Sequence, residues 1–316
     1  MDYAITGGAG FIGTHVAQRL IEQGHSVHVF SRRPPTDPFR KQVWDECDTR
    51  TILDLTKQVP DFSQMHRVIH LAADMGGVGY FSKEDYYPYI NNSRIDFNVL
   101  QAIERYKIDR SFVASSACAY PTEVQTIEGF APKLHEGLLE TGTPDLMYGR
   151  EKLMLIRLAE RHPLDVRVGI LHTVYGIGQE SVGQRMKFPT AAASKALQAI
   201  KTKRIEVWGN GKQLRSYLYI SDAVSKILAV LEGEYDGPVN IGAEGAVTCD
   251  QVVELCAKLA GVDSYEIVHN PAEPSGVLGR DCDNRKFNNL YGDLQELGYS
   301  EGYGLLIDWL RQNGSY

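Results

Sequence analysis

Short apolar runs alternate with longer amphipathic stretches through the first half of the chain. The apolar runs have the length of buried β-strands, and they lie at Tyr3–Ile5, Ser26–Phe30, Val68–Leu71, Ser111–Ala114 and Val166–Leu171. Between them, apolar residues recur with a helical period, most clearly over Phe11–Glu22, Asn91–Tyr106 and Tyr148–Arg161. Because strands that alternate with helices form parallel sheets covered on both faces, we expect an α/β fold with a Rossmann-like, doubly wound parallel sheet.

The pattern loosens after about residue 172, where the loops become longer. We expect residues 1–172 to form a dinucleotide-binding domain and residues 173–316 to form mostly a smaller, C-terminal substrate-binding lobe. The apolar run Val239–Ile241 is expected to return to the first domain, within a crossing near residues 205–245. Because of this return the boundary between the two parts is blurred, and no repeat or low-complexity linker marks it.

Composition narrows the class of protein. The chain has 316 residues, of which 43% are hydrophobic and 23% charged, as in ordinary globular proteins. A net charge of −7 argues against nucleic acid as the main partner, and no apolar run is long enough to span a membrane. Five cysteines without a C-x-x-C pair favour reduced thiols over a metal site. With no signal peptide before the first strand, we expect a cytoplasmic protein.

A glycine-rich turn joins the first predicted strand to the first predicted helix. Gly7, Gly10 and Gly13 follow a G-x-x-G-x-x-G spacing, and Phe11 and Ile12 stand inside it. Glycines permit a tight turn and a close approach of the backbone to a pyrophosphate, which the free N–H groups at the start of the helix can bind. The turn therefore predicts a dinucleotide cofactor at these residues.

The end of the second strand bears on which dinucleotide is bound. An acidic residue there would bind the ribose 2′-hydroxyl of NAD, but this chain has Ser31-Arg32-Arg33. Since arginine can bind a 2′-phosphate, NADP is slightly favoured, with NAD as the alternative; two solvated arginines also fit the pattern. Further predicted cofactor contacts are Asp54 and Leu55, together with Leu71, Ala72 and Ala73 at the end of the apolar run Val68–Leu71. Asp54 fits a solvated surface position equally well.

Tyr148 and Lys152 lie one helical turn apart, so their side chains share a face. The ammonium of Lys152 favours the phenolate of Tyr148 and can also hold the nicotinamide ribose. Tyr148 can then take the proton of a substrate hydroxyl as hydride leaves the same carbon. Ser116, at a strand end, can hydrogen-bond the reacting oxygen. Cys118 adds a thiol that a simple dehydrogenase does not need, which predicts an enzyme that oxidises its substrate briefly, moves protons and reduces it again.

These residues resemble the extended short-chain dehydrogenase/reductase family of NAD-dependent epimerases and dehydratases. More narrowly, the chain resembles the GDP-mannose 3,5-epimerase group in three strings, which are Leu71–Gly79, Ser115–Pro121 and Tyr148–Lys152. The likeness continues through Met186–Pro189, Trp208–Gly211 with Arg215-Ser216, and Gly276–Arg280 with Asp283-Asn284. It therefore covers nearly the whole chain, and the Ala-Asp-Met-Gly-Gly and Ser-Ala-Cys-x-Tyr-Pro strings are its most specific parts.

The resemblance implies an isomerase that acts on a GDP-hexose. Oxidation at C4 makes a ketone, which acidifies the hydrogens on C3 and C5. Cys118 and Lys187 match the acid/base pair of the family, and both a thiol and an amine can be tuned toward neutral pH by their surroundings. Because the hydride then returns to C4, the NAD(P) cofactor is expected to stay tightly bound and to be recycled.

The resemblance also implies contacts with the substrate. Gly76 and Gly77 would let the substrate approach the backbone, and Arg215 and Arg280 match the family's diphosphate ligands. The other expected substrate contacts are Ser116, Cys118, Thr173, Lys187, Lys195 and Gln213. Thr173 stands where we would expect Asn, and Lys195 and Gln213 also fit solvated positions. For Trp208 we favour packing in the lobe core over stacking on a base.

Two other functions remain open at this point. The neighbouring GDP-fucose synthases epimerise and then reduce a 4-keto-6-deoxy sugar with NADPH, and they place a histidine opposite the cysteine. Lys187 favours the epimerase, whereas Ser31-Arg32-Arg33 slightly favours the reductase. A non-catalytic NAD(P)-binding regulator is the least favoured function, since it has no use for the whole set of catalytic side chains. The family also leads us to expect a homodimer formed through the helices Asn91–Tyr106 and Tyr148–Arg161.

Overall fold

A seven-stranded sheet forms the centre of the computed structural model, which describes residues 1–183 and 185–313. The strand order is β12-β7-β5-β4-β1-β2-β3, and every neighbouring pair is parallel. In that order the strands are Pro238–Ile241, Val166–Leu171, Arg110–Ser116, Arg67–His70, Asp2–Thr6, Ser26–Ser31 and Thr49–Ile52. The predicted α/β fold with a doubly wound parallel sheet is therefore confirmed.

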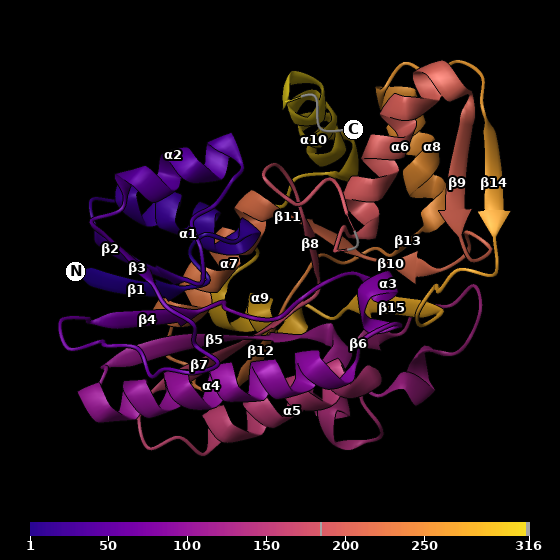
Figure 1. Cartoon of the computed structure of the whole chain (residues 1–316). Helices are drawn as coiled ribbons and strands as arrows, with labels where there is room; N and C mark the ends of the chain where they lie inside the picture. The colour runs from indigo at the N-terminus through magenta and orange to yellow at the C-terminus, as the bar shows by residue number, and fades with distance from the viewer. Residues whose placement is uncertain (184, 314–316) are drawn as a thin grey trace.

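Helices cover both faces of this sheet (Figure 1). On one face lie α4 (Tyr86–Tyr106) and α5 (Leu146–Glu160), whose buried residues pack on strands β4, β5 and β7. The other face carries α1 (Phe11–Glu22), α2 (Pro38–Glu46) and α7 (Ile220–Glu232). The strands other than β3 are largely buried and rich in apolar residues, as the sequence pattern requires, whereas β3 at the sheet edge is mostly exposed.

The later part of the chain builds a second, smaller lobe beside the carboxyl ends of the central strands (Figure 1). Its helices are α6 (Phe188–Thr202), α8 (Cys249–Leu259) and α10 (Tyr299–Asn313), with the short α3 (Val78–Phe81) and α9 (Arg285–Tyr291) near the junction of the lobes. The remaining strands are β6 (Lys133–Leu134), β8 (Thr173–Tyr175), β9 (Arg204–Trp208), β10 (Leu214–Arg215), β11 (Tyr217–Tyr219), β13 (Val247–Thr248), β14 (Glu266–Asn270) and β15 (Gly279–Cys282).

The two lobes are interleaved along the sequence. Strand β12 pairs with β7 in the central sheet, which is where the apolar run Val239–Ile241 was expected to return. In the opposite direction, β6 joins the four-stranded sheet β13-β10-β15-β6. One hydrophobic cluster also runs from α1 and α7 into α6, α8 and α10, so the lobes share a continuous core.

Local signals explain how the elements begin and end. Helix α1 has the predicted bounds, and Gly24 follows it in the left-handed region at φ 77°, a backbone conformation that glycine adopts without strain. Helix α4 begins earlier than predicted, at Tyr86 instead of Asn91. Pro88 lies in its first turn, where a helix does not need the backbone N–H, so the proline does not delay the start.

No helix in residues 1–183 and 185–313 combines the length and apolar character needed to cross a bilayer. The same residues contain no group of three or more His, Cys, Asp or Glu side chains arranged to hold a metal ion.

Candidate active site

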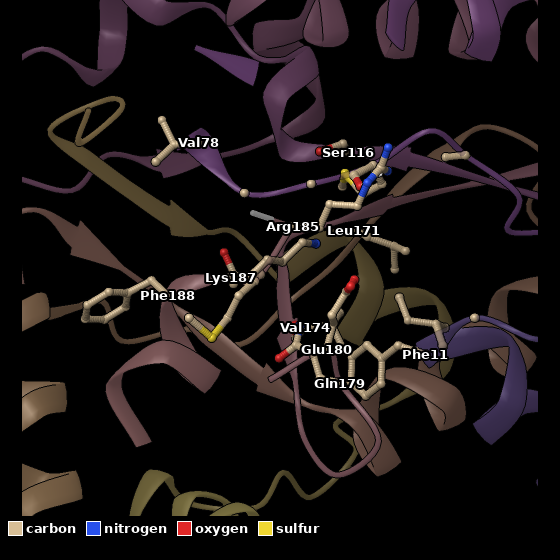
Figure 2. Close-up of a pocket in the computed structure, with 18 of the residues that line it drawn as sticks. Phe11, Val78, Ser116, Leu171, Val174, Gln179, Glu180, Arg185, Lys187 and Phe188 are labelled. Atoms are coloured by element: carbon tan, nitrogen blue, oxygen red, sulfur yellow. Dashed lines mark hydrogen bonds between the residues drawn. The ribbon is translucent and has the colours of Figure 1, made fainter. Parts of the chain in front are cut away.

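One cavity of about 1170 Å3 brings the predicted site residues together. Every one of them lines this cavity except Asp54. The cavity lies at the carboxyl ends of the central strands and extends between the two lobes, which is where open α/β sheets bind ligands. Figure 2 shows its centre, with Ser116 on one side, Lys187 extending toward it from the opposite loop, and Phe11 at the start of α1.

The glycine turn forms a cradle of the kind that a dinucleotide needs. A Cβ on Gly7 would lie 2.8 Å from the backbone nitrogen of Ala72, and one on Gly13 would lie 2.3 Å from the carbonyl oxygen of Gly7. Gly10 is the N-cap of α1 and supplies no side-chain cap, so the first N–H groups of the helix remain available to an anion. The local geometry therefore fits a pyrophosphate.

The corner of the cavity after β2 is rich in arginine. Arg32 and Arg33 line it together with Ser31, and α2 adds Arg40, which the sequence analysis did not single out. Asp54, in contrast, lies off the cavity wall. Its carboxylate accepts hydrogen bonds from the backbone N–H of Thr56 at 3.1 Å and from the Thr56 hydroxyl at 2.7 Å, and so stabilises a local turn.

Tyr148 and Lys152 are both buried, with 3% and 2% of their surface exposed. The Lys152 Nζ lies 5.9 Å from the centre of the Tyr148 ring. Burial raises the pKa of Tyr148 above its usual value, although the Lys152 charge and a hydrogen bond with Ser116 act in the opposite direction. Burial alone would lower the pKa of Lys152, but the acidic side chains beside it, first Asp96 and then Glu151, outweigh burial and raise that pKa. Lys152 is therefore a cation beside the phenol.

A glycine sets the position of Cys118 against helix α5. A Cβ on Gly149 would lie 2.1 Å from the carbonyl oxygen of Cys118, so only glycine permits this contact. The same oxygen accepts a hydrogen bond of 3.0 Å from the backbone N–H of Asp145. Ser116 accepts one of 3.2 Å from the backbone N–H of Cys118 through its hydroxyl. These contacts place the hydroxyl, the thiol and the phenol on one wall.

Arg280 lies at the thiol. Its Nη1 is 3.4 Å from the Cys118 Sγ, its Nη2 is 3.2 Å from Asp145 Oδ2, and its Nε donates to Gln125 Oε1 at 2.6 Å. The sequence predicted a diphosphate ligand at this position. The structure adds that the guanidinium also donates a hydrogen bond to the sulfur that we expect to exchange protons.

Lys187 comes from the second lobe, at the N-cap of α6. Desolvation lowers the pKa of its ammonium, and the nearby Cys118 partly offsets that effect. Among the described residues, no carboxylate lies within ion-pair distance of Lys187. An amine that is desolvated and has no fixed counter-ion is suited to proton transfer.

The loop after β4 is fastened to the segment that carries Lys187, a feature that the sequence analysis missed. Arg185 pairs with Asp74 at 2.8 Å, donates to the carbonyl oxygen of Met75 at 2.6 Å, and lies 4.2 Å from the centre of the Tyr80 ring. A Cβ on Gly77 would lie 2.7 Å from the Met186 carbonyl oxygen. Gly77 is thus required for packing between protein segments. Asp74, within the Ala-Asp-Met-Gly-Gly string, was the one residue in the sequence that could have indicated this ion pair.

The second lobe supplies the far end of the cavity. Arg215 donates to the carbonyl oxygens of Leu214 and Val277, while Lys195 donates to the Glu206 carbonyl oxygen at 2.8 Å. The side-chain oxygen of Gln213 is buried and has no hydrogen-bond partner within residues 1–183 and 185–313. Trp208 is 38% exposed and lines the cavity, so the expectation that it packs in the lobe core is wrong. Its place on an outward-facing position of the edge-lying strand β9 accounts for the difference.

Comparisons with known proteins agree with this geometry. A family model described as "NAD dependent epimerase/dehydratase family" matches residues 3–242. The GDP-mannose 3,5-epimerase of Arabidopsis thaliana is 31% identical over 319 residues, covering 99% of this chain and 82% of the relative.

Solved structures resemble the whole fold. The UDP-glucose 4-epimerase of Thermotoga maritima, solved with UDP-glucose, has a TM-score of 0.86 at 23% identity, with 99% of each chain covered. A UDP-glucuronic acid 4-epimerase of Bacillus cereus, solved with UDP-glucuronic acid and NAD, has a TM-score of 0.81 at 22% identity and covers 99% of this chain and 100% of its own. At these identities the likeness shows the fold.

The predicted relationship to NAD-dependent nucleotide-sugar epimerases, which are isomerases, is confirmed by the match over most of the chain and by a full-length relative above 30% identity. The chain therefore belongs to the NAD dependent epimerase/dehydratase family.

Proposed function

We propose that the chain is a GDP-sugar epimerase of the GDP-mannose 3,5-epimerase type. The observation that carries this proposal is the meeting of a thiol and an amine at one cavity with the Tyr148–Lys152 pair. Cys118 comes from the first lobe and Lys187 from the second, and they are close enough to interact electrostatically. The GDP-mannose 3,5-epimerase of Arabidopsis thaliana, 31% identical to this chain, supports the choice of substrate class.

The first half of the reaction belongs to Tyr148, Lys152 and Ser116. Tyr148 takes the proton of the C4 hydroxyl, Ser116 holds the C4 oxygen by a hydrogen bond, and the Lys152 charge stabilises the phenolate. The bound nicotinamide supplies reversible hydride transfer at C4. Tyr148 later returns the same proton to the C4 oxygen, so the sugar regains its hydroxyl without net oxidation.

The second half belongs to Cys118 and Lys187. The C4 ketone makes the C–H bonds at C3 and C5 acidic, because the resulting carbanion is delocalised onto the ketone oxygen. One of the two residues removes a proton from one face of the sugar ring, and the other delivers a proton to the opposite face. The configuration at that carbon is thereby inverted, and the substrate and its epimer have the same number of protons and electrons.

The proposed cofactor is a tightly held NAD(P) that is recycled in each turnover, with a slight preference for NADP. Gly7, Gly10 and Gly13 would hold its pyrophosphate at the start of α1. Arg32, Arg33 and Arg40 lie on the wall after β2, where a 2′-phosphate can accept hydrogen bonds from guanidinium groups.

We also propose a homodimer formed through α4 and α5. Large apolar side chains are exposed along α4, with 63% of Tyr86, 60% of Tyr87 and 50% of Phe97 accessible in the single chain. Exposed apolar side chains concentrated on one helix favour a protein partner. Light scattering of the wild type should give the mass of a dimer, and Phe97→Arg should reduce it. A wild type that stays monomeric would contradict this part of the proposal.

The function can be tested with the purified protein and no added cofactor. Incubation with GDP-mannose should yield epimeric GDP-hexoses by NMR, whereas UDP-glucose should remain unchanged. Conversion of UDP-glucose alone would overturn the assignment to GDP-sugars. No conversion of either sugar by protein shown to contain NAD(P) would overturn the proposed epimerase.

An epimerase–reductase is the second candidate, because the arginines after β2 favour NADP. Such an enzyme would consume one equivalent of NADPH for each molecule of a GDP-4-keto-6-deoxy sugar. Measuring NADPH absorbance with that substrate separates the two functions, since the proposed epimerase consumes none.

A further inference from the structure

Next to Lys152 lies a buried group of ionisable side chains that do not line the cavity and that the proposed steps do not use. Asp96 comes from α4, Glu151 from α5 and His70 from β4. The exposed fraction is 0% for Asp96, 0% for Glu151 and 2% for His70. Ionisable side chains are rarely buried this completely unless they are paired, so the group calls for an explanation.

Short contacts connect these side chains in a line. The Lys152 Nζ lies 3.0 Å from Glu151 Oε1 and 3.7 Å from Asp96 Oδ2. On the other side of Asp96, its Oδ1 lies 3.0 Å from His70 Nε2, and His70 Nδ1 lies 2.6 Å from the Thr6 hydroxyl. The line therefore runs from the residue before Gly7 to the lysine beside Tyr148.

The carboxyl groups in this line have unsatisfied oxygens. Among the described residues, both side-chain oxygens of Glu151 and the Oδ2 of Asp96 are buried without a partner in hydrogen-bond geometry, although the Lys152 ammonium lies close to both side chains. Two ionised carboxylates facing one ammonium would also leave a net negative charge in the protein interior. Neighbouring buried carboxylates avoid that cost when one of them keeps its proton.

We propose that Glu151 and Asp96 share one proton, which makes Glu151 a neutral carboxylic acid at neutral pH and leaves Asp96 as the counter-ion of Lys152. We assign the proton to Glu151 because, among the described residues and apart from the other carboxyl group, Asp96 has two polar neighbours, Lys152 Nζ at 3.7 Å and His70 Nε2 at 3.0 Å, whereas Glu151 has only Lys152 Nζ at 3.0 Å. The proposal makes Glu151 a positioning residue, which acts on the phenol of Tyr148 only through the charge around Lys152.

The electrostatic surroundings support this assignment. Burial raises the pKa of Glu151 to about 9, with Lys152 acting against the shift and Asp96 adding to it. Burial and the Lys152 charge lower the pKa of His70 to about 3, so the imidazole is neutral. The groups that face Glu151 are thus Lys152 on its own helix, Asp96 on α4 and His70 on β4.

The shared proton has a consequence for the reaction. An ionised Glu151 raises the pKa of the Tyr148 phenol by electrostatic repulsion of the phenolate. A neutral Glu151 leaves the Lys152 charge available to Tyr148. As pH rises through the range in which Glu151 ionises, Tyr148 should become a poorer proton acceptor and turnover should fall.

Infrared spectroscopy of the holoenzyme tests the protonation state directly. In the wild type, the carbonyl-stretch band of a protonated carboxylic acid should persist above about pH 7, well beyond the range of ordinary carboxyl groups. Glu151→Gln should remove this band. Glu160→Gln is the matched control, because Glu160 lies on the same helix at the surface, paired with Arg157. Absence of any such band in the wild type, or an unchanged band in Glu151→Gln, would overturn the proposal.

Thermal unfolding gives a second readout that does not depend on activity. A group whose pKa is higher in the folded than in the unfolded state loses its stabilising effect as pH rises. Between about pH 5 and about pH 9, the melting temperature of the wild type should therefore fall relative to that of Glu151→Gln. A difference between the two proteins that is constant with pH would contradict the raised pKa.

The pH dependence of turnover forms the third readout, and it alone rests on the proposed epimerase function. Glu151→Gln should hold its kcat to higher pH than the wild type, and Asp96→Asn should shift the profile because Lys152 loses its counter-ion. If the infrared and unfolding results hold while no GDP-sugar is converted, the proposed function fails and the shared proton stands. If the wild type and Glu151→Gln are both active and their kcat falls in the same way at high pH, the proposed effect of Glu151 on Tyr148 is wrong.

Discussion

The two proposed halves of the candidate site are built in different ways. The proposed hydride half, which consists of Ser116, Tyr148 and Lys152, comes from the end of β5 and from α5 in a single lobe. The proposed proton half consists of Cys118 on a short turn and Lys187 at the start of α6 in the other lobe. The first half is fixed by one sheet and one helix, whereas the second depends on how the lobes are held together.

The difference concerns how each proposed half is held in place. Tyr148 and Lys152 lie one turn apart on α5, so their relative position does not depend on the second lobe. The Arg185–Asp74 ion pair and the Gly77–Met186 contact hold Lys187 near the wall that carries Cys118. On the proposed mechanism, the packing between the lobes places Lys187 and so decides which protons of the sugar it can reach.

Removing the phenol should have the largest effect, because it disables both halves. In Tyr148→Phe the C4 hydroxyl has no proton acceptor, and without a C4 ketone the neighbouring C–H bonds are not acidic. Turnover of GDP-mannose should fall by about 10²–10⁴-fold, and solvent hydrogen exchange should fall with it. Exchange that continues at the wild-type rate would show that the two halves are independent.

Removing the proton half should separate the two activities. Cys118→Ala and Lys187→Met should each lower epimer formation by about 10²–10³-fold, while transient absorbance of reduced nicotinamide still appears on mixing with substrate. Lys201→Met, an exposed position near the end of the same helix α6, serves as the control. If either variant loses the absorbance change as well, its residue also belongs to the hydride half.

A smaller effect is expected from the cofactor corner. Arg32→Asp replaces a guanidinium by a carboxylate where a 2′-phosphate is proposed to bind. Since a hydrogen bond to a charged group contributes about 1.5–3 kcal/mol, the ratio of NADP to NAD affinity should fall roughly tenfold to hundredfold. Affinities measured on cofactor-stripped protein test this, and an unchanged ratio would favour two solvated arginines.

The smallest expected effect is on stability, and it concerns Lys187. Desolvation lowers the pKa of this ammonium below its usual value of 10.5, so the unfolded state binds the proton more tightly and protonation opposes folding. Lys187→Met should raise the melting temperature at neutral pH, by about 1.5 °C for each kcal/mol of stability gained, and the gain should shrink as the pH approaches the usual lysine pKa. A gain that grows with pH would contradict the lowered pKa.

The sequence predicted the parts of the molecule that depend on short-range order. The bounds of α1 and β7 follow from apolar periodicity and from Gly24, and the cavity contains nearly every residue that the motifs singled out. Periodicity and motifs in the sequence do not predict contacts between segments that are far apart in the chain. Arg185 with Asp74, Arg280 with Cys118, and Glu151 with Asp96 each join separate elements, so only their packing brings them together.

One error and one missed contact have the same cause. Trp208 is a residue type that is common in cores, yet its strand lies at an edge and the side chain faces the cavity. Gly77 stays a predicted substrate contact, and the structure adds that a Cβ there would lie 2.7 Å from the Met186 carbonyl oxygen. In both cases the residue type was informative, but its neighbours from another part of the chain determined its role.

Incubation with GDP-mannose in deuterium oxide, without added cofactor, tests the division of labour most directly. The wild type should incorporate deuterium at C3, C5 or both as epimers form. Cys118→Ala and Lys187→Met should each lose incorporation or inversion while C4 oxidation continues, and Tyr148→Phe should lose both. Epimers that form without deuterium at C3 or C5, or wild-type exchange rates in both Cys118→Ala and Lys187→Met, would contradict the account.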